Sequence, residues 1–261
     1  NFSQAPEEYS KRVEEFYLSK YLPLLKEAKK ELSIPVIASI CCKTNENWQN
    51  YAERFVAAGA DAIEINYYPV TSDASVTSSE IDKEFEKFVK FARKTISCPV
   101  SIKMGSKYTD MAHKIKYLDD QNINGVVLFN KTFRPNVNIN TMTISNGSAI
   151  SAGTEYTNSL RWTALMAGEV KMDICANTGI HSAETVIKML LAGAKAVEVC
   201  SVIMKNGYEV IGKMNEEILA WMEAKQFSSV SDFCGKLAQE KNAEGYKWER
   251  TQFLNLIGGD N

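Results

Sequence analysis

Six short runs rich in β-branched residues recur along the 261-residue chain, and each is followed by a polar loop and a helical pattern. The runs are PVIASI (35–40), DAIEIN (61–66), PVSIKM (99–104), GVVLFN (125–130), DICANT (173–178) and AVEVC (196–200). Apolar strands that alternate with amphipathic helices form parallel sheets joined by crossover helices. The chain is therefore expected to be an α/β protein built on a parallel sheet.

The segments around these runs have the three-to-four spacing of apolar residues that is typical of helices. We expect helices in NENWQNYAERFVAAGA (45–60) and SAETVIKMLLAGAK (182–195), an early helix in 7–32 and a last one in 215–227. The last helix leads into SVSDFCGKLAQ (229–239).

The number of strands leaves two architectures open. A (β/α)8 TIM barrel has eight strands, whereas six are visible here, and the chain begins without Met. One interpretation is a single barrel domain over 1–261 whose first two strands precede this sequence. The alternative is an open, doubly wound sheet of six strands.

Composition and charge exclude several classes of protein. A net charge of −2 gives no basis for a broad nucleic-acid surface. The six Cys lack C-x-x-C spacing and only two His are present, so we expect reduced thiols and no metal centre. No apolar run approaches the roughly 20 residues that span a bilayer. These features predict a cytoplasmic protein without a membrane partner.

Residues 131–162 break the alternation, because they are too polar and too rich in Asn, Ser and Gly for a simple loop between strand and helix. Long insertions after a barrel strand commonly shape a substrate cavity. We therefore expect 131–162 to lie over the active-site face. The alternative is a small surface hairpin without a role.

Polar residues gather where the predicted strands end, and in both architectures this edge carries the active site. Lys103 stands late in an apolar run, so its ammonium needs an anion, a carbonyl or a cofactor to offset burial. Asn66 and Asn130 end their strands and could present amides to a planar heterocycle. The alternatives are that Lys103 reaches solvent and that each Asn caps a helix or turn.

The last two strand ends predict an anion site. Asn177, Thr178 and Gly179 follow one strand, and Cys200 and Ser201 follow the next. Free backbone N–H groups there, with the positive end of a following helix, favour an anion such as a phosphate. The alternative is that these residues only terminate strands and cap helices.

Six motifs, in this order, resemble those of the dihydroorotate dehydrogenase family, a set of FMN-dependent (β/α)8 barrels. They are EIN (64–66), IKM (102–104), LFN (128–130), NTGIHSAE (177–184), LLAGAKAVEVCS (190–201) and SVSDFCGKL (229–237). Each motif alone is a weak signal, whereas their order and spacing over nearly the whole chain are specific.

The resemblance implies an enzyme of pyrimidine biosynthesis that oxidises dihydroorotate or a related dihydropyrimidine by hydride transfer to FMN. It implies that Thr178, Gly179, Cys200 and Ser201 hold the FMN phosphate, and that Lys103 contacts the flavin ring or ribityl chain. Asn66 and Asn130 would face the substrate or the flavin. It also implies a homodimer, for which 131–162 or the first helix could supply the surface.

The sequence departs from the family at the catalytic base, which is a Cys or Ser before Pro in the loop after the EIN strand. Tyr68 stands in this place, followed by Pro69, and Ser72 lies further along the loop. Tyr68 and Ser72 are the candidate bases, and Thr71, Cys41 or Cys42 could serve instead. A phenol is a poor base unless a cation lowers its pKa.

Two further functions remain open. A degenerate barrel could keep a flavin or phosphate site without turnover, which the altered base loop favours. An aldolase could instead form a Schiff base through Lys103, which needs a neutral, desolvated amine.

Overall fold

The computed structural model describes residues 7–41, 45–69, 71–131 and 134–249. The chain divides into two compact units, residues 1–102 and 103–261. Strand β3 (Val100–Met104) begins in the first unit and ends in the second.

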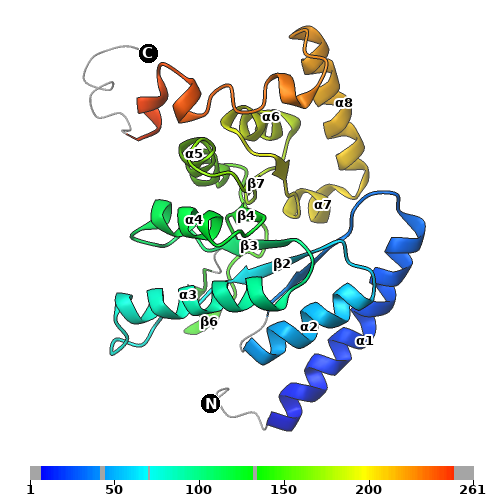
Figure 1. Ribbon diagram of the computed structural model, residues 1–261, viewed down its shortest axis with the longest axis vertical. Helices are drawn as coiled ribbons and strands as arrows, with labels where there is room; N and C mark the ends of the chain where they lie inside the picture. The colour runs from blue at the N-terminus through cyan, green and yellow to red at the C-terminus, as the bar shows by residue number, and fades with distance from the viewer. Residues whose placement is uncertain (1–6, 42–44, 70, 132–133, 250–261) are drawn as a thin grey trace. The chain divides into compact units, whose positions relative to one another are not determined.

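The first unit alternates helices and parallel strands (Figure 1). Its elements are α1 (Glu7–Glu31), β1 (Ile37–Ile40), α2 (Asn45–Ala57), β2 (Ala62–Tyr67), α3 (Ser78–Thr95) and the first residues of β3. Helix α3 begins with a capping box, in which Thr77 and Glu80 satisfy each other's backbone N–H groups.

The two faces of β2 differ in chemistry because side chains alternate along a strand. Ile63 and Ile65 are fully buried. Glu64 and Asn66 point the other way, and Ser39 of β1 donates a 2.5 Å hydrogen bond to the Glu64 carboxylate. Polar side chains thus share one face of this part of the sheet, and the apolar core lies on the other.

The second unit continues the alternation and adds a hairpin (Figure 1). Its elements are the end of β3, α4 (Met111–Asp120), β4 (Gly125–Leu128), β5 (Asn136–Asn138), β6 (Thr143–Ser145), α5 (Tyr156–Met166), β7 (Asp173–Ala176), α6 (Ala183–Ala192), β8 (Ala196–Val197), α7 (Ser201–Asn206) and α8 (Glu209–Ala224). In the described part of the chain after α8, up to residue 249, three short 3-10 turns follow.

Strand order separates the two architectures that the sequence leaves open. The six described strands of the main sheet are hydrogen-bonded in the order β1-β2-β3-β4-β7-β8, which is the order of the chain. A doubly wound sheet reverses its order at a switch point, whereas a (β/α)8 barrel adds each strand beside the previous one. The fold is therefore of the (β/α)8 barrel type, with six strands of the main sheet among the described residues, and each of the six predicted runs contains one of them.

A contact within the second unit shows that its sheet is curved. Strands β3 and β8 are three positions apart, so a flat sheet would hold them roughly 14 Å apart, with side chains perpendicular to it. Lys103 Nζ of β3 nevertheless lies 2.6 Å from Glu198 Oε2, directly after β8. The two side chains meet on the concave side, as barrel curvature requires.

The segment 131–162 is only partly irregular. Residues 156–162 form the first turns of α5, and β5 and β6 pair as a small antiparallel hairpin. Val137, Ile139, Met142 and Ile144 of this hairpin are exposed. Between hairpin and helix, Ser151 is buried, so part of the segment turns inward.

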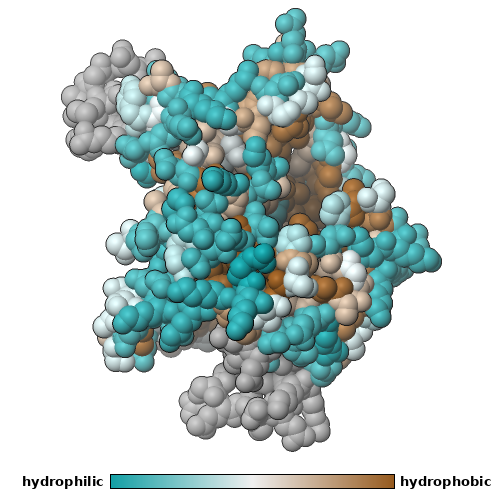
Figure 2. All heavy atoms as spheres, viewed as in Figure 1, coloured by the Kyte–Doolittle hydropathy of each residue, from teal (hydrophilic) through white to brown (hydrophobic). Residues whose placement is uncertain are grey.

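The surface of the second unit carries apolar side chains on its last long helix. Figure 2 shows apolar atoms over α8, where Ile211 and Leu219 are exposed. Among the described residues, no helix is both long and apolar enough to cross a membrane.

Gly193 and Gly212 offer a matched test of the packing in the second unit. Gly193 ends α6 with φ +114°, and a Cβ there would lie 2.4 Å from Ala167 Cβ. Gly193→Ala should lower the free energy of unfolding by about 2 kcal/mol or more, through backbone strain and the clash. Gly212→Ala, in open space on α8, should raise it by about 0.5 to 1 kcal/mol. Urea unfolding measures both, and equal effects would contradict this packing.

Candidate functional site

Lys103 is a predicted site residue that lies in the second unit. It stands near the carboxyl end of β3 and its side chain is 16% exposed. Its ammonium pairs with the carboxylate of Glu198, whose side chain is 32% exposed. A partly buried ion pair of this kind holds both side chains in a fixed place.

Hydrogen bonds between strand ends bring Asn130 close to Lys103. The Asn130 N–H donates to the carbonyl of Met104, the residue after Lys103, at 2.8 Å. The next strand end is linked in the same way, because the Asn177 N–H donates to Leu128 O at 2.7 Å. The ends of β3, β4 and β7 thus form one continuous edge.

The side chains of Asn177 and Thr178 converge on one backbone carbonyl. Asn177 Nδ2 donates to Phe129 O at 3.1 Å, and Thr178 Oγ1 donates to the same oxygen at 2.7 Å. Thr178 has φ +77°, which is strained for a β-branched residue, and its hydroxyl contact helps to hold this conformation.

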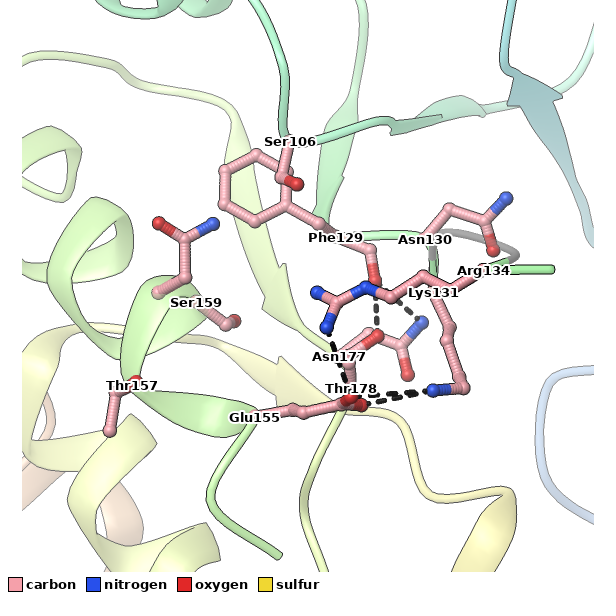
Figure 3. Close-up of a pocket in the computed structure, with 11 residues that line it drawn as sticks. Ser106, Phe129, Asn130, Lys131, Arg134, Glu155, Thr157, Ser159, Asn177 and Thr178 are labelled. Carbon is pink, nitrogen blue, oxygen red and sulfur yellow. Dashed lines mark hydrogen bonds and ion pairs between the residues drawn. The ribbon is translucent and has the colours of Figure 1, made fainter. Parts of the chain in front are cut away.

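A polar cavity of about 400 Å³ opens beside this edge (Figure 3). It contains three of the predicted site residues, Asn130, Asn177 and Thr178. Its other lining residues are Ser106, Phe129, Lys131, Arg134, Glu155, Thr157, Asn158 and Ser159.

Two cations and one carboxylate lie in the wall of the cavity. Glu155 Oε2 lies 3.1 Å from Lys131 Nζ, and Glu155 Oε1 lies 4.0 Å from a nitrogen of Arg134. One carboxylate thus serves two cations in this wall. Lining of this chemistry suits a small anionic ligand that carries hydrogen-bonding groups.

Ser151 lies where the sequence predicts an anion. The Gly179 N–H donates to Ser151 Oγ at 3.3 Å, and the Ser151 N–H donates to Ser201 Oγ at 2.9 Å. Ser151 Oγ is also 3.0 Å from His181 Nε2, and Ser151 is only 5% exposed. Gly179 and Ser201 are therefore brought together around a buried hydroxyl of the chain itself.

The other predicted anion ligands have different surroundings. The Thr178 hydroxyl donates its hydrogen bond to Phe129 O. Cys200 is exposed and directly precedes α7. Strand β8 ends at Val197, so Cys200 and Ser201 lie a few residues beyond the strand, whereas the sequence predicts a strand through Cys200. Its last ladder hydrogen bond runs from the Glu198 N–H to Ala176 O.

Three predicted residues belong to the first unit. Asn66 lies in β2 and is half-buried, Tyr68 follows β2 and is half-buried, and Ser72 is exposed. Of the alternative bases, Thr71 and Cys41 are exposed, and Cys42 lies outside the described residues. Their roles stay predictions.

Tyr67, the neighbour of Tyr68, is unsuited to proton transfer near neutral pH. Its ring stacks on Phe88, with 4.5 Å between centroids, and contacts Phe85 edge-on. Burial, with a smaller contribution from the charge of Glu84, raises the pKa of Tyr67 to about 12.

Three residues near the predicted ligands were not predicted from the sequence: Glu198, Ser151 and His181. A Glu inside the apolar stretch Ala-Val-Glu-Val is a signal that could have identified Glu198, because a partly buried carboxylate needs a partner. Ser151 is one of many Ser and Asn residues in its segment and carries no comparable signal.

Comparison with known proteins gives the family. The model of the family described as "Dihydroorotate dehydrogenase" matches residues 14–222, most of the chain. The chain belongs to the dihydroorotate dehydrogenase family. The resemblance predicted from the six motifs is thus confirmed, as is the fold that it implies.

Relatives within the family have different names. A protein of Aeropyrum pernix with the provisional name dihydroorotate dehydrogenase A (fumarate) is 26% identical over 81% of this chain and 70% of that protein. The dihydroorotate dehydrogenase B (NAD(+)) catalytic subunit of Lachnoclostridium phytofermentans is 23% identical, over 79% and 70%. The NAD-dependent dihydropyrimidine dehydrogenase subunit PreA of Escherichia coli K12 is 24% identical, over 86% and 58%.

His181 offers a titration test of the geometry around Ser151. Burial, and then the charge of Lys205, lowers the pKa of His181, and contacts with Ser151 and Glu155 offset this in part. NMR titration should give a midpoint below the ordinary 6.5, with His181→Gln identifying the signal. Because the unfolded chain takes up this proton first, stability should fall as pH drops below 6.5, and less so in His181→Gln. A midpoint at or above 6.5 would contradict the described environment.

Proposed function

We propose that this chain binds FMN and oxidises dihydroorotate or a related dihydropyrimidine, passing a hydride to the flavin. Family membership supports a dehydrogenase of this type. The observation that carries the proposal is Lys103, a largely buried cation held near the carboxyl end of β3 by its ion pair with Glu198. Asn130, whose N–H donates to the neighbouring Met104, lines the polar cavity, although Lys103 is not among the lining residues. A fixed cation of this kind can stabilise negative charge that develops on a flavin ring.

The residues of the second unit suit the parts of FMN. Lys103 would contact the ring or ribityl chain, and Asn130 would offer its amide to the ring or the substrate. Ser151 Oγ is an oxygen that already receives the Gly179 N–H, beside His181 and Ser201. A phosphate oxygen in its place would meet the same groups, with Asn177, Thr178 and Cys200 close in sequence.

When bound, FMN supplies the hydride acceptor, and the chain supplies orientation and proton transfer. We propose Tyr68 or Ser72 as the base that removes the substrate proton, and Asn66 as an amide that faces the substrate or flavin. The oxidation removes two electrons and two protons from the substrate, so an electron acceptor must then reoxidise the flavin, and the family resemblance implies a soluble one.

The ion pair of Lys103 weighs against the aldolase alternative. A Schiff base requires a neutral amine, whereas a carboxylate 2.6 Å away favours the ammonium form. The second candidate function is a barrel that binds flavin or phosphate without turnover. Tyr68 in the place of a Cys or Ser favours it.

We also propose that the protein acts as a homodimer. Both predicted surfaces expose apolar side chains: Phe16, Tyr17, Tyr21 and Leu24 on α1, and Ile139, Met142 and Ile144 on the hairpin. Contiguous exposed apolar groups can form a contact surface between protein chains.

Absorbance titration with FMN, followed by anaerobic dihydroorotate, tests the proposal. The purified chain should bind FMN, and the flavin bands should bleach when dihydroorotate is added. Lys103→Met should weaken FMN binding about tenfold, the effect of losing one charged hydrogen bond. Lys107→Met removes an exposed cation four residues further on and should match the wild type.

Each other result has a distinct meaning. Flavin bands that persist with dihydroorotate and with dihydrouracil would favour the barrel without turnover. Failure of the wild-type chain to bind added FMN would refute the proposed function. Equal affinity of Lys103→Met and the wild type for FMN would show that Lys103 does not contact the cofactor.

A further inference from the structure

Glu198 occupies an unusual place for a carboxylate. It follows the apolar residues Ala196 and Val197, and its own N–H continues the ladder of β8 to Ala176 O at 2.9 Å. Burying a carboxylate is costly unless a cation and hydrogen bonds compensate. Lys103, 95 residues earlier, provides the cation at 2.6 Å. Each group thus offsets the desolvation of the other.

The pair also fixes where the Lys103 charge lies. A lysine has a long, flexible side chain with several rotamers, and a charged contact at this distance selects one of them. The contact joins two strands that are not neighbours in the sheet, so Glu198 directs the ammonium toward the interior of the curve rather than to solvent.

We propose that Glu198 is a positioning residue that holds Lys103 and partly cancels its charge toward bound FMN. This inference rests on the proposed flavin function. A lone cation beside the flavin favours the reduced, more negative ring, and an adjacent carboxylate opposes that effect. The Lys103–Glu198 pair then sets how much more tightly the chain binds reduced FMN than oxidised FMN. That ratio determines the reduction potential of the bound cofactor.

The consequence concerns the second half of the reaction. A lower potential makes the reduced flavin a stronger reductant, which assists transfer of its electrons to an acceptor. It also makes oxidation of the substrate less favourable. Glu198 thus favours acceptors that a flavin without this nearby carboxylate would reduce less readily.

Dissociation constants of oxidised and dithionite-reduced FMN, measured anaerobically by titration, test this inference without turnover. Glu198→Gln should raise the preference for reduced FMN about tenfold relative to the wild type, equivalent to about 30 mV for a two-electron couple. Lys103→Met should change the preference in the opposite direction. Glu198→Asp keeps the charge and should stay near the wild-type ratio.

Glu216→Gln is the matched control, because it removes an exposed carboxylate from α8 and should leave the ratio unchanged. If Glu198→Gln does not fold, the opposite shift in Lys103→Met and the wild-type ratio in Glu198→Asp still test the charge argument.

The outcomes separate this inference from the function on which it rests. A wild-type chain that binds no FMN refutes the proposed function and this inference together. A wild-type chain that binds FMN, with the same ratio in Glu198→Gln, overturns the role of Glu198 alone. A shift of equal size in Glu216→Gln also overturns it, because the effect would then be general charge and not position.

Discussion

Parallel pairing is the constraint on which the candidate site depends. Because β4, β7 and β8 of the second unit pair in parallel, their carboxyl ends lie along one edge. The backbone bonds from Asn130 to Met104 and from Asn177 to Leu128 extend this edge beyond the regular strands. Curvature then turns the edge inward, so that Lys103 and Glu198 meet although two strands lie between theirs. The direction of strand pairing, more than any single side chain, determines which residues meet at this edge.

The elements with strong local signals could be predicted from the sequence. Continuous apolar runs such as Gly-Val-Val-Leu identify a strand buried on both faces, and β4 is buried at every position. Lys103 and Asn130 could be predicted for the same reason, since each interrupts or ends such a run. Helix α7 is too short for a periodic signal, and β8 forms only two residues of regular pairing.

The partners of the site residues could not be predicted. Glu198 is 95 residues from Lys103, and only the curvature of the sheet brings them together. Ser151 reaches Gly179 and Ser201 from an irregular segment whose path no residue pattern specifies. Local patterns determine which residues face an edge, whereas contacts across it depend on how the elements pack.

Polar groups along this edge satisfy one another within the chain. Phe129 O receives two side-chain donors, Glu155 faces two cations, and Ser151 is bonded to the turn after β7 and to Ser201. Such internal partners avoid the cost of unpaired buried groups and stabilise the chain in the form described.

The buried hydroxyl of Ser151 has a consequence for any anion that binds beside Gly179. Such an anion competes with a group tethered to the same molecule, at a high effective concentration set by the short segment between β6 and α5. Its observed affinity is the intrinsic affinity multiplied by the fraction of molecules in which Ser151 has withdrawn. Residue 151 therefore acts as a built-in competitor, and a substitution that shortens its side chain would change occupancy without touching the ligand.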